Sequence, residues 1–231
     1  RDLRMSRGLG DVYKRQGYYY IFAPAGGVAT GWQLVLRSKN IYGPYESKIV
    51  MAQGKTNING PHQGGWVDTN TGESWFVHFQ DKGAYGRVIH LNPMTWVNDW
   101  PVIGVDKDED GCGEPVTTYK KPNVGKTYPI ATPPESDEFN TRHLGLQWQW
   151  HANKKDTYGF TTDLGYIRLY AGSLSKEFVN FWEVPNLLMQ KFPAEEFTAT
   201  TKLTFTAKQD GEQTGIIVMG LSLIHISEPT R

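Results

Sequence analysis

The chain has 231 residues, enough for one large or two modest domains with a buried core. Its 24 basic residues equal its 24 acidic residues, so no basic field exists to hold a nucleic-acid backbone. No apolar run approaches the roughly 18 residues of a membrane span, and one cysteine, Cys112, excludes an internal disulfide framework. We therefore expect neither nucleic acid nor a membrane as a partner.

Both ends of the chain depart from the pattern between them. Arg1–Gln16 (RDLRMSRGLGDVYKRQ) holds five basic residues and shows no helix or strand period, and Leu221–Arg231 (LSLIHISEPTR) interrupts an alternating strand pattern. Both resemble translated sequencing-adapter read-through, and neither has the layout of a signal peptide. We set residues 1–16 and 221–231 aside as extraneous, with ordinary disordered termini as the alternative. The remainder is expected to be a fragment of a longer protein.

Residues 17–122 are predicted to form two cycles of short strands. Aromatic residues make up 13% of the chain, and 25 Gly and 13 Pro interrupt it often, which favours strands and tight turns. Three or four strands recur about every 45 residues, which is typical of β-propeller blades or a meander. The predicted strands are Tyr18–Pro24, Gln33–Ser38, Tyr45–Met51, Gly65–Asp68, Ser74–Gln80, Arg87–Leu91 and Trp100–Val105.

A linker is predicted at residues 123–140, which are rich in Pro and in charged side chains. Residues 141–220 are predicted to open a β-sandwich, because Thr198–Ala207 (TATTKLTFTA) alternates strictly, as a half-buried strand does. The other strands expected there are Gly145–Trp150, Tyr166–Tyr170 and Gly215–Met219.

Two stretches resemble consecutive late blades of glycoside hydrolase family 43: GYYYIFAPAGGVATGWQLVLRSKNIYGPYE and GPHQGGWVDTNTGESWFVHFQDKGAYGRVIHLNPMTWVNDWPVIG. A third, LGLQWQWHANKKDTYGFTTDLGYIRLY, resembles the start of the concanavalin A-like β-sandwich behind that propeller. The resemblance covers about residues 17–220. It implies an all-β fold, with the last blades of a five-bladed β-propeller in residues 17–122 and a partial concanavalin A-like β-sandwich in residues 141–220.

The resemblance also implies a glycosidase. Family members invert the anomeric centre and cleave xylosidic or arabinofuranosidic bonds of plant hemicellulose oligosaccharides. We expect a xylo- or arabino-oligosaccharide substrate, no required cofactor, and a periplasmic or secreted bacterial parent. The sequence leaves open xylose against arabinose specificity, exo against endo action, and the oligomeric state.

Inversion needs an acid that protonates the leaving oxygen and a base that activates water, roughly 6.5–9.5 Å apart. In the family's chain order the three carboxylates, two Asp and one Glu, precede the blade that begins here. We therefore expect no catalytic residue in this chain, do not assign Asp11 as one, and expect the chain alone to be inactive. The alternatives are a non-catalytic carbohydrate-binding protein and an unrelated propeller used as an interaction scaffold.

The resemblance nominates two substrate-binding residues. His62, in GPHQGG, matches a family His in the axial channel beside a metal or water, although Pro61 and Gln63 replace the usual flanking glycines. Arg87, in AYGRVIHL, matches an arginine that contacts the sugar. A His packed in a polar turn and a surface Arg are the alternatives. Further candidates for lining a sugar platform lie near these motifs, with core packing as the alternative for each tryptophan: Gln63, Trp66 and Trp32.

A short acidic run gives the remaining candidate metal site besides His62. Asp106, Asp108 and Asp110, followed by Gly111, resemble a D-x-D-x-D-G calcium loop. The twelfth position is Thr117 rather than Glu, and no flanking helices are predicted. A solvated acidic turn is favoured, with adventitious Ca²⁺ as the alternative.

Overall fold

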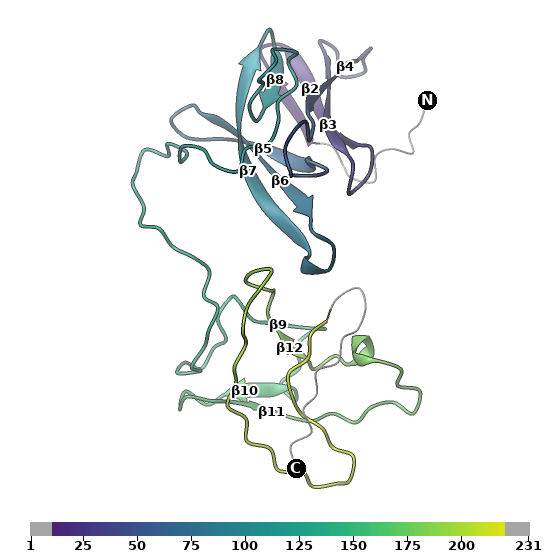
Figure 1. Cartoon of the computed structure of the whole chain (residues 1–231), viewed down its shortest axis with the longest axis vertical. Helices are drawn as coiled ribbons and strands as arrows, with labels where there is room; N and C mark the ends of the chain where they lie inside the picture. The colour runs from purple at the N-terminus through teal and green to yellow at the C-terminus, as the bar shows by residue number, and fades with distance from the viewer. Residues whose placement is uncertain (1–10, 220–231) are drawn as a thin grey trace. The chain divides into compact units, whose positions relative to one another are not determined.

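The computed structural model describes residues 11–219 of the chain. The chain forms two compact units that meet in sequence between Tyr128 and Pro129, inside the linker predicted at residues 123–140 (Figure 1). Residues 1–10 and 220–231, and with them the whole of Leu221–Arg231, lie outside the described residues. No helix in residues 11–219 combines the length and the apolar character needed to cross a membrane.

The first unit consists of two four-stranded antiparallel sheets, each with its strands in chain order. All the strands predicted between residues 17 and 122 are present, with ends shifted by one to several residues. The first sheet contains β1 (Asp11–Arg15), β2 (Tyr18–Ala25), β3 (Trp32–Ser38) and β4 (Glu46–Met51). The second contains β5 (His62–Asp68), β6 (Ser74–Asp81), β7 (Arg87–Val97) and β8 (Trp100–Ile103), with a 3₁₀ turn, η2 (Gly83–Tyr85), between β6 and β7. The all-β prediction is confirmed.

Strand β1 lies within the segment set aside as extraneous, so the expectation of no strand in Arg1–Gln16 is wrong for Asp11–Arg15. The two-residue turn Gln16–Gly17 has φ of +49° and +84°, the left-handed geometry that joins tight hairpins. Tyr13 then pairs with Tyr20, and its ring lies 5.4 Å from that of Phe22. The basic residues made this strand hard to predict, because a charged side chain is expected to point to solvent. In the structure the Arg15 guanidinium instead packs on the ring of Trp96.

The core of the first unit forms where the two sheets pack together. Its buried members are Tyr20, Phe22, Val35, Val50 and Met51 from the first sheet and Phe76, Met94 and Ile103 from the second. They alternate with more exposed residues along their strands, as expected of sheets with one covered face. The two sheets therefore share one core.

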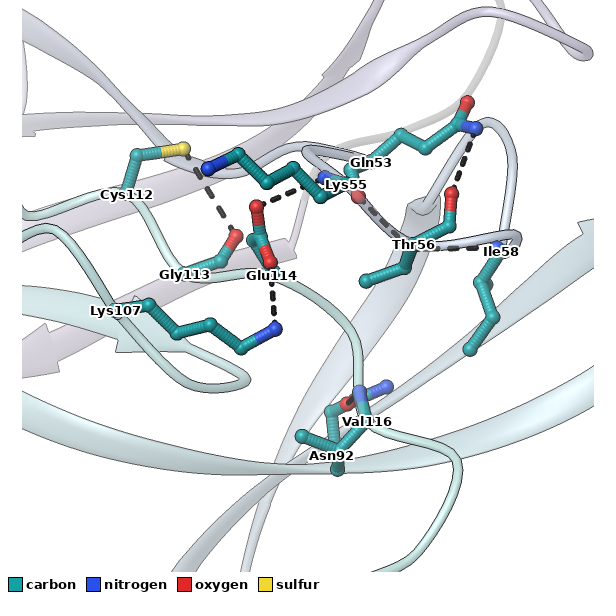
Figure 2. A network of polar contacts seen from close by, with 10 residues as sticks. All are labelled: Gln53, Lys55, Thr56, Ile58, Asn92, Lys107, Cys112, Gly113, Glu114 and Val116. Carbon is teal, nitrogen blue, oxygen red and sulfur yellow. Dashed lines mark hydrogen bonds and ion pairs between the residues drawn. The ribbon is translucent and has the colours of Figure 1, made fainter.

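A short segment after β8 joins the outer strands of both sheets. Gly113 bridges Met51 at the end of β4, while Glu114 bridges Val105 just beyond β8. The carboxylate of Glu114 accepts hydrogen bonds from the Lys55 backbone N–H and from the Lys107 ammonium, both at 2.9 Å (Figure 2). The strand edges near these positions are therefore partly paired within the chain.

The second unit has little regular structure. Its strands are β9 (Gln149–Trp150), β10 (Gly159–Thr161), β11 (Ile167–Leu169) and β12 (Leu188–Met189), with η3 (Phe181–Glu183) before β12. They pair as two two-stranded antiparallel sheets, β10 with β11 and β9 with β12. The predicted strands Tyr166–Tyr170 and Gly145–Trp150 are thus present only in part.

The strand predicted at Thr198–Ala207 is not formed, and that prediction is wrong. At Gly215–Met219 only a single bridge residue, Val218, is present. Thr198–Ala207 is irregular and exposed throughout. An alternating sequence becomes a strand only when a neighbouring strand takes up its N–H and C=O groups. In residues 11–219 no named strand pairs with this segment.

Candidate functional site

His62, the first residue of β5, is 2% exposed. Its Nδ1 lies 2.7 Å from the Gly60 carbonyl oxygen, so Nδ1 carries the proton and Nε2 keeps a lone pair. Burial lowers the pKa of His62; the bond to Gly60 opposes this effect and the positive charge of Arg87 adds to it. The imidazole is therefore neutral at pH 7.

The glycine-rich loop between β2 and β3 lies directly against this imidazole. A Cβ placed on Gly31 would lie 2.6 Å from His62 Nε2 and 2.5 Å from the carbonyl oxygens of Ala25 and Gly27. The same loop is also tied to the segment before β5, where the Asn59 side-chain amide donates to the Ala29 carbonyl at 3.1 Å. Only a residue without a side chain fits at position 31, so the loop closes over the ring.

Arg87, the first residue of β7, is exposed, and its guanidinium lies 4.6 Å from the centre of the Phe79 ring. Phe79 is the cross-strand partner of His62, and the two rings are 5.8 Å apart. The structure thus brings His62 and Arg87 to one end of the second sheet, with Phe79 between them. Sequence reasoning missed Phe79. The available signal was the antiparallel register, which sets it opposite His62.

The structure does not gather the other predicted platform residues around Arg87. Trp66 pairs with the core residue Phe76, and its ring contacts Trp96 at 5.0 Å, as the core-packing alternative expected. The ring of Trp32 lies beside Gly26, where an added Cβ would come within 2.7 Å of it. Gln63 is exposed at the bulge after His62, with φ of +56°.

A row of buried polar side chains, which the sequence did not single out as a group, runs beside the site along β6 and β7. His78 is 2% exposed and its Nε2 accepts from the Asn92 side-chain amide at 2.6 Å, while Asn92 Oδ1 accepts from the Val116 N–H at 2.7 Å. His90 stacks on His78 at 5.4 Å and donates to Gln80. Burial is the main cause that lowers the pKa of His78 to about 4. These neutral groups connect the two strands and the segment after β8.

The acidic turn brings the carboxylates of Asp106, Asp108 and Asp110 within 4.8 Å of one another. Asp106 accepts from the backbone N–H groups of Glu109 and Gly111, each at 2.8 Å, and Asp110 accepts from the N–H of Cys112 at 2.7 Å. Burial and then the charge of Asp110 raise the pKa of the Cys112 thiol to about 11. The turn's own amides thus donate to Asp106 and Asp110, and within residues 11–219 the three Asp residues of this turn are the group that could hold a cation.

Two family models match the chain in succession. The model of glycosyl hydrolases family 43 matches residues 10–101, which include β1. The model of the beta xylosidase C-terminal concanavalin A-like domain matches residues 136–227. The two matches lie on either side of the boundary at Tyr128.

Similar proteins include a putative beta-xylosidase of Xylanibacter ruminicola, 48% identical over 194 residues that cover 83% of this chain and 36% of the relative. A beta-xylosidase of Formosa agariphila is 34% identical, over 90% of this chain and 41% of the relative. A non-reducing end alpha-L-arabinofuranosidase of Bacteroides ovatus is 29% identical, over 89% and 40%. The chain thus spans about two fifths of the length of these relatives.

Solved structures show the same likeness. The Bacteroides ovatus xyloglucan-locus GH43B aligns with a TM-score of 0.66 at 25% identity, over 84% of this chain and 40% of that one. A bifunctional GH43-CE protein of Bacteroides eggerthii aligns with a TM-score of 0.62 at 31% identity, over 79% and 22%.

Proposed function

The chain belongs to glycosyl hydrolases family 43 and carries that family's concanavalin A-like C-terminal domain, and from this we propose that it is part of an inverting glycosidase acting on xylosidic or arabinofuranosidic bonds. The observation that carries the proposal is the 48% identity to a putative beta-xylosidase over 83% of the chain. Because the relatives include both a beta-xylosidase and an alpha-L-arabinofuranosidase, the proposal keeps xylose and arabinose as possible sugars of the cleaved bond.

In this proposal Arg87 contacts the sugar. Its guanidinium is exposed at the end of β7, and a planar fork of N–H donors suits paired hydroxyl groups on a pentose. The buried imidazole of His62 contributes by holding the loop at Gly31 in place. Its contact with a central metal or water stays a prediction.

We further propose that these 231 residues alone do not hydrolyse glycosides. An inverting site needs an acid and a base carboxylate roughly 6.5–9.5 Å apart on opposite faces of the sugar. Among residues 11–219, neither Arg87 nor His62 forms an ion pair or hydrogen bond with a carboxylate. Glu73 and Glu114 are already paired with Lys120 and Lys107.

A chimera tests the proposed function. Residues 11–219 replace the matching segment of the Xylanibacter ruminicola relative, and the chimera and the chain alone are assayed on aryl β-D-xylosides and aryl α-L-arabinofuranosides. We expect the chimera to cleave at least one of these glycosides and the chain alone to cleave neither. NMR of the newly released sugar shows whether the anomeric configuration is inverted.

The controls separate the outcomes. Circular dichroism establishes that each protein is folded, and Arg87→Ala in the chimera should lower kcat/KM by about tenfold or more, as loss of a charged hydrogen bond to substrate does. A folded chimera that binds xylo-oligosaccharides without cleaving them would favour the non-catalytic binding protein instead. Turnover by the chain alone would contradict the proposed inactivity.

A further inference from the structure

Among residues 11–219, three arginines lie against aromatic rings, and they differ in how their N–H donors are used. Arg15 lies over Trp96, and its Nη1 donates to the Gln16 side chain at 3.3 Å. Arg37 lies over the rings of Tyr18 and Trp100. Its Nη1 donates to the Asn98 and Asp99 carbonyls and its Nη2 donates to Glu46, while its buried Nε has no hydrogen-bond partner among the described residues. Its fork is therefore committed to the protein.

Arg87 has the ring contact without those partners. Its guanidinium lies over Phe79, and in the described residues 11–219 it makes no ion pair or hydrogen bond. A ring face attracts a guanidinium through the ring quadrupole and leaves its in-plane N–H groups unoccupied. An arginine held in this way is oriented and still able to donate to a ligand.

Phe79 is itself fixed. Phe79 is 7% exposed and lies on β6, where it pairs with Ile89 of β7. Its ring contacts the imidazole of His62. His62 in turn is fixed by its bond to Gly60 and by the close approach of Gly31. A rigid stack thus runs from the loop between β2 and β3, through His62 and Phe79, to Arg87.

We propose that Phe79 is a positioning residue, whose ring face orients the Arg87 guanidinium so that its N–H fork is presented to the hydroxyl groups of a pentose. The inference rests on the proposed function, because it assigns to Phe79 the placement of the group that contacts the sugar. Phe79 acts through Arg87 and is not itself a catalytic residue.

The test is a double-mutant cycle on sugar affinity in the full 231-residue chain. Methyl β-D-xyloside and methyl α-L-arabinofuranoside are titrated by NMR against the wild type, Phe79→Leu, Phe79→Tyr, Arg87→Ala and Phe79→Leu/Arg87→Ala. A cation–π contact at an exposed site changes an equilibrium by about two- to five-fold. We expect Phe79→Leu to weaken binding by that factor, and Phe79→Tyr, which keeps the ring face, to bind as the wild type does.

Phe76→Leu is the matched control. Phe76 lies on the same strand with its side chain in the core on the other face, so this change loses ring packing without touching Arg87. Thermal unfolding of each variant shows the loss of stability separately from the loss of affinity. A purely structural role for Phe79 predicts that both Leu variants affect binding alike.

The decisive comparison is the effect of Phe79→Leu when Arg87 is already Ala. No further loss of affinity in that background supports the inference, since Phe79 then acts only through the guanidinium. An equal loss in both backgrounds, or an unchanged affinity in Phe79→Leu, overturns it and leaves the proposed function standing. If the wild type binds neither glycoside, the inference is overturned before any variant is compared, and the chimera assay decides the proposed function separately.

Discussion

Arg37 offers the sharpest test of how the two sheets of the first unit are held together. It lies on β3 of the first sheet, and its Nη1 donates to the carbonyls of Asn98 and Asp99 at 2.9 and 3.0 Å. These residues form the turn between β7 and β8 of the second sheet, with φ of +51° and +59°. We expect Arg37→Met to loosen this turn, because Met keeps the apolar stem and loses every donor.

The magnitude follows from the contacts removed. A hydrogen bond from a charged donor contributes about 1.5–3 kcal/mol, and the ring contacts with Tyr18 and Trp100 add about 0.5–1 kcal/mol each. The ion pair with Glu46 adds little, because that carboxylate is 66% exposed. The two carbonyls share one Nη1 and are partly solvated, so the losses overlap, and we expect the free energy of unfolding to fall by about 2–3 kcal/mol.

The assay is urea unfolding combined with amide hydrogen exchange of β3 and β8, which reports on the first unit separately from the second. Lys39→Met is the matched control: Lys39 lies on the same face near Tyr18, is exposed, and should cost less than about 0.5 kcal/mol. Arg37→Lys should fall between the two. If Arg37→Met lowers stability no more than Lys39→Met does, Arg37 does not hold the sheets together.

Three further predictions concern pH, the loop over the site, and calcium. The pKa of His78 is about 4 in the folded chain, below the value of about 6.5 for an unfolded histidine, so the unfolded state binds the extra proton between these values. The contribution of His78 to the free energy of unfolding should be complete above pH 6.5 and decrease as the pH drops toward 4. The urea midpoint of the His78→Gln variant should therefore decrease less over this range than that of the wild type. Gly31→Ala should destabilise by about 1–3 kcal/mol because its Cβ has no room, whereas Gly27→Ala, with its nearest contact at 3.6 Å, should be nearly neutral in thermal unfolding. Millimolar CaCl₂ should leave the unfolding temperature unchanged, because Asp106 and Asp110 are already bonded to amides; a rise that Asp108→Asn abolishes would contradict this.

The strands of the first unit could be predicted because local signals agree there. Period-two alternation and turn residues such as Gly72 mark each hairpin. Strand β1 was not predicted because its turn, Gln16–Gly17, lies among basic residues. A strand was wrongly predicted at Thr198–Ala207 because alternation indicates a preference for extended structure but does not provide a partner strand. The family resemblance, carried by the blade motifs, is confirmed by both family models.

The all-β class, the hairpins between residues 17 and 122, the family resemblance, and the candidates His62 and Arg87 can all be inferred from the order of residues. The position of Phe79 between His62 and Arg87, and the packing of Trp66 against the core, follow from the fold. The physical reason is that alternation shows which residues share a face of a strand. Which face a second sheet covers, and which strand ends meet across the register, depend on contacts between residues far apart in the chain.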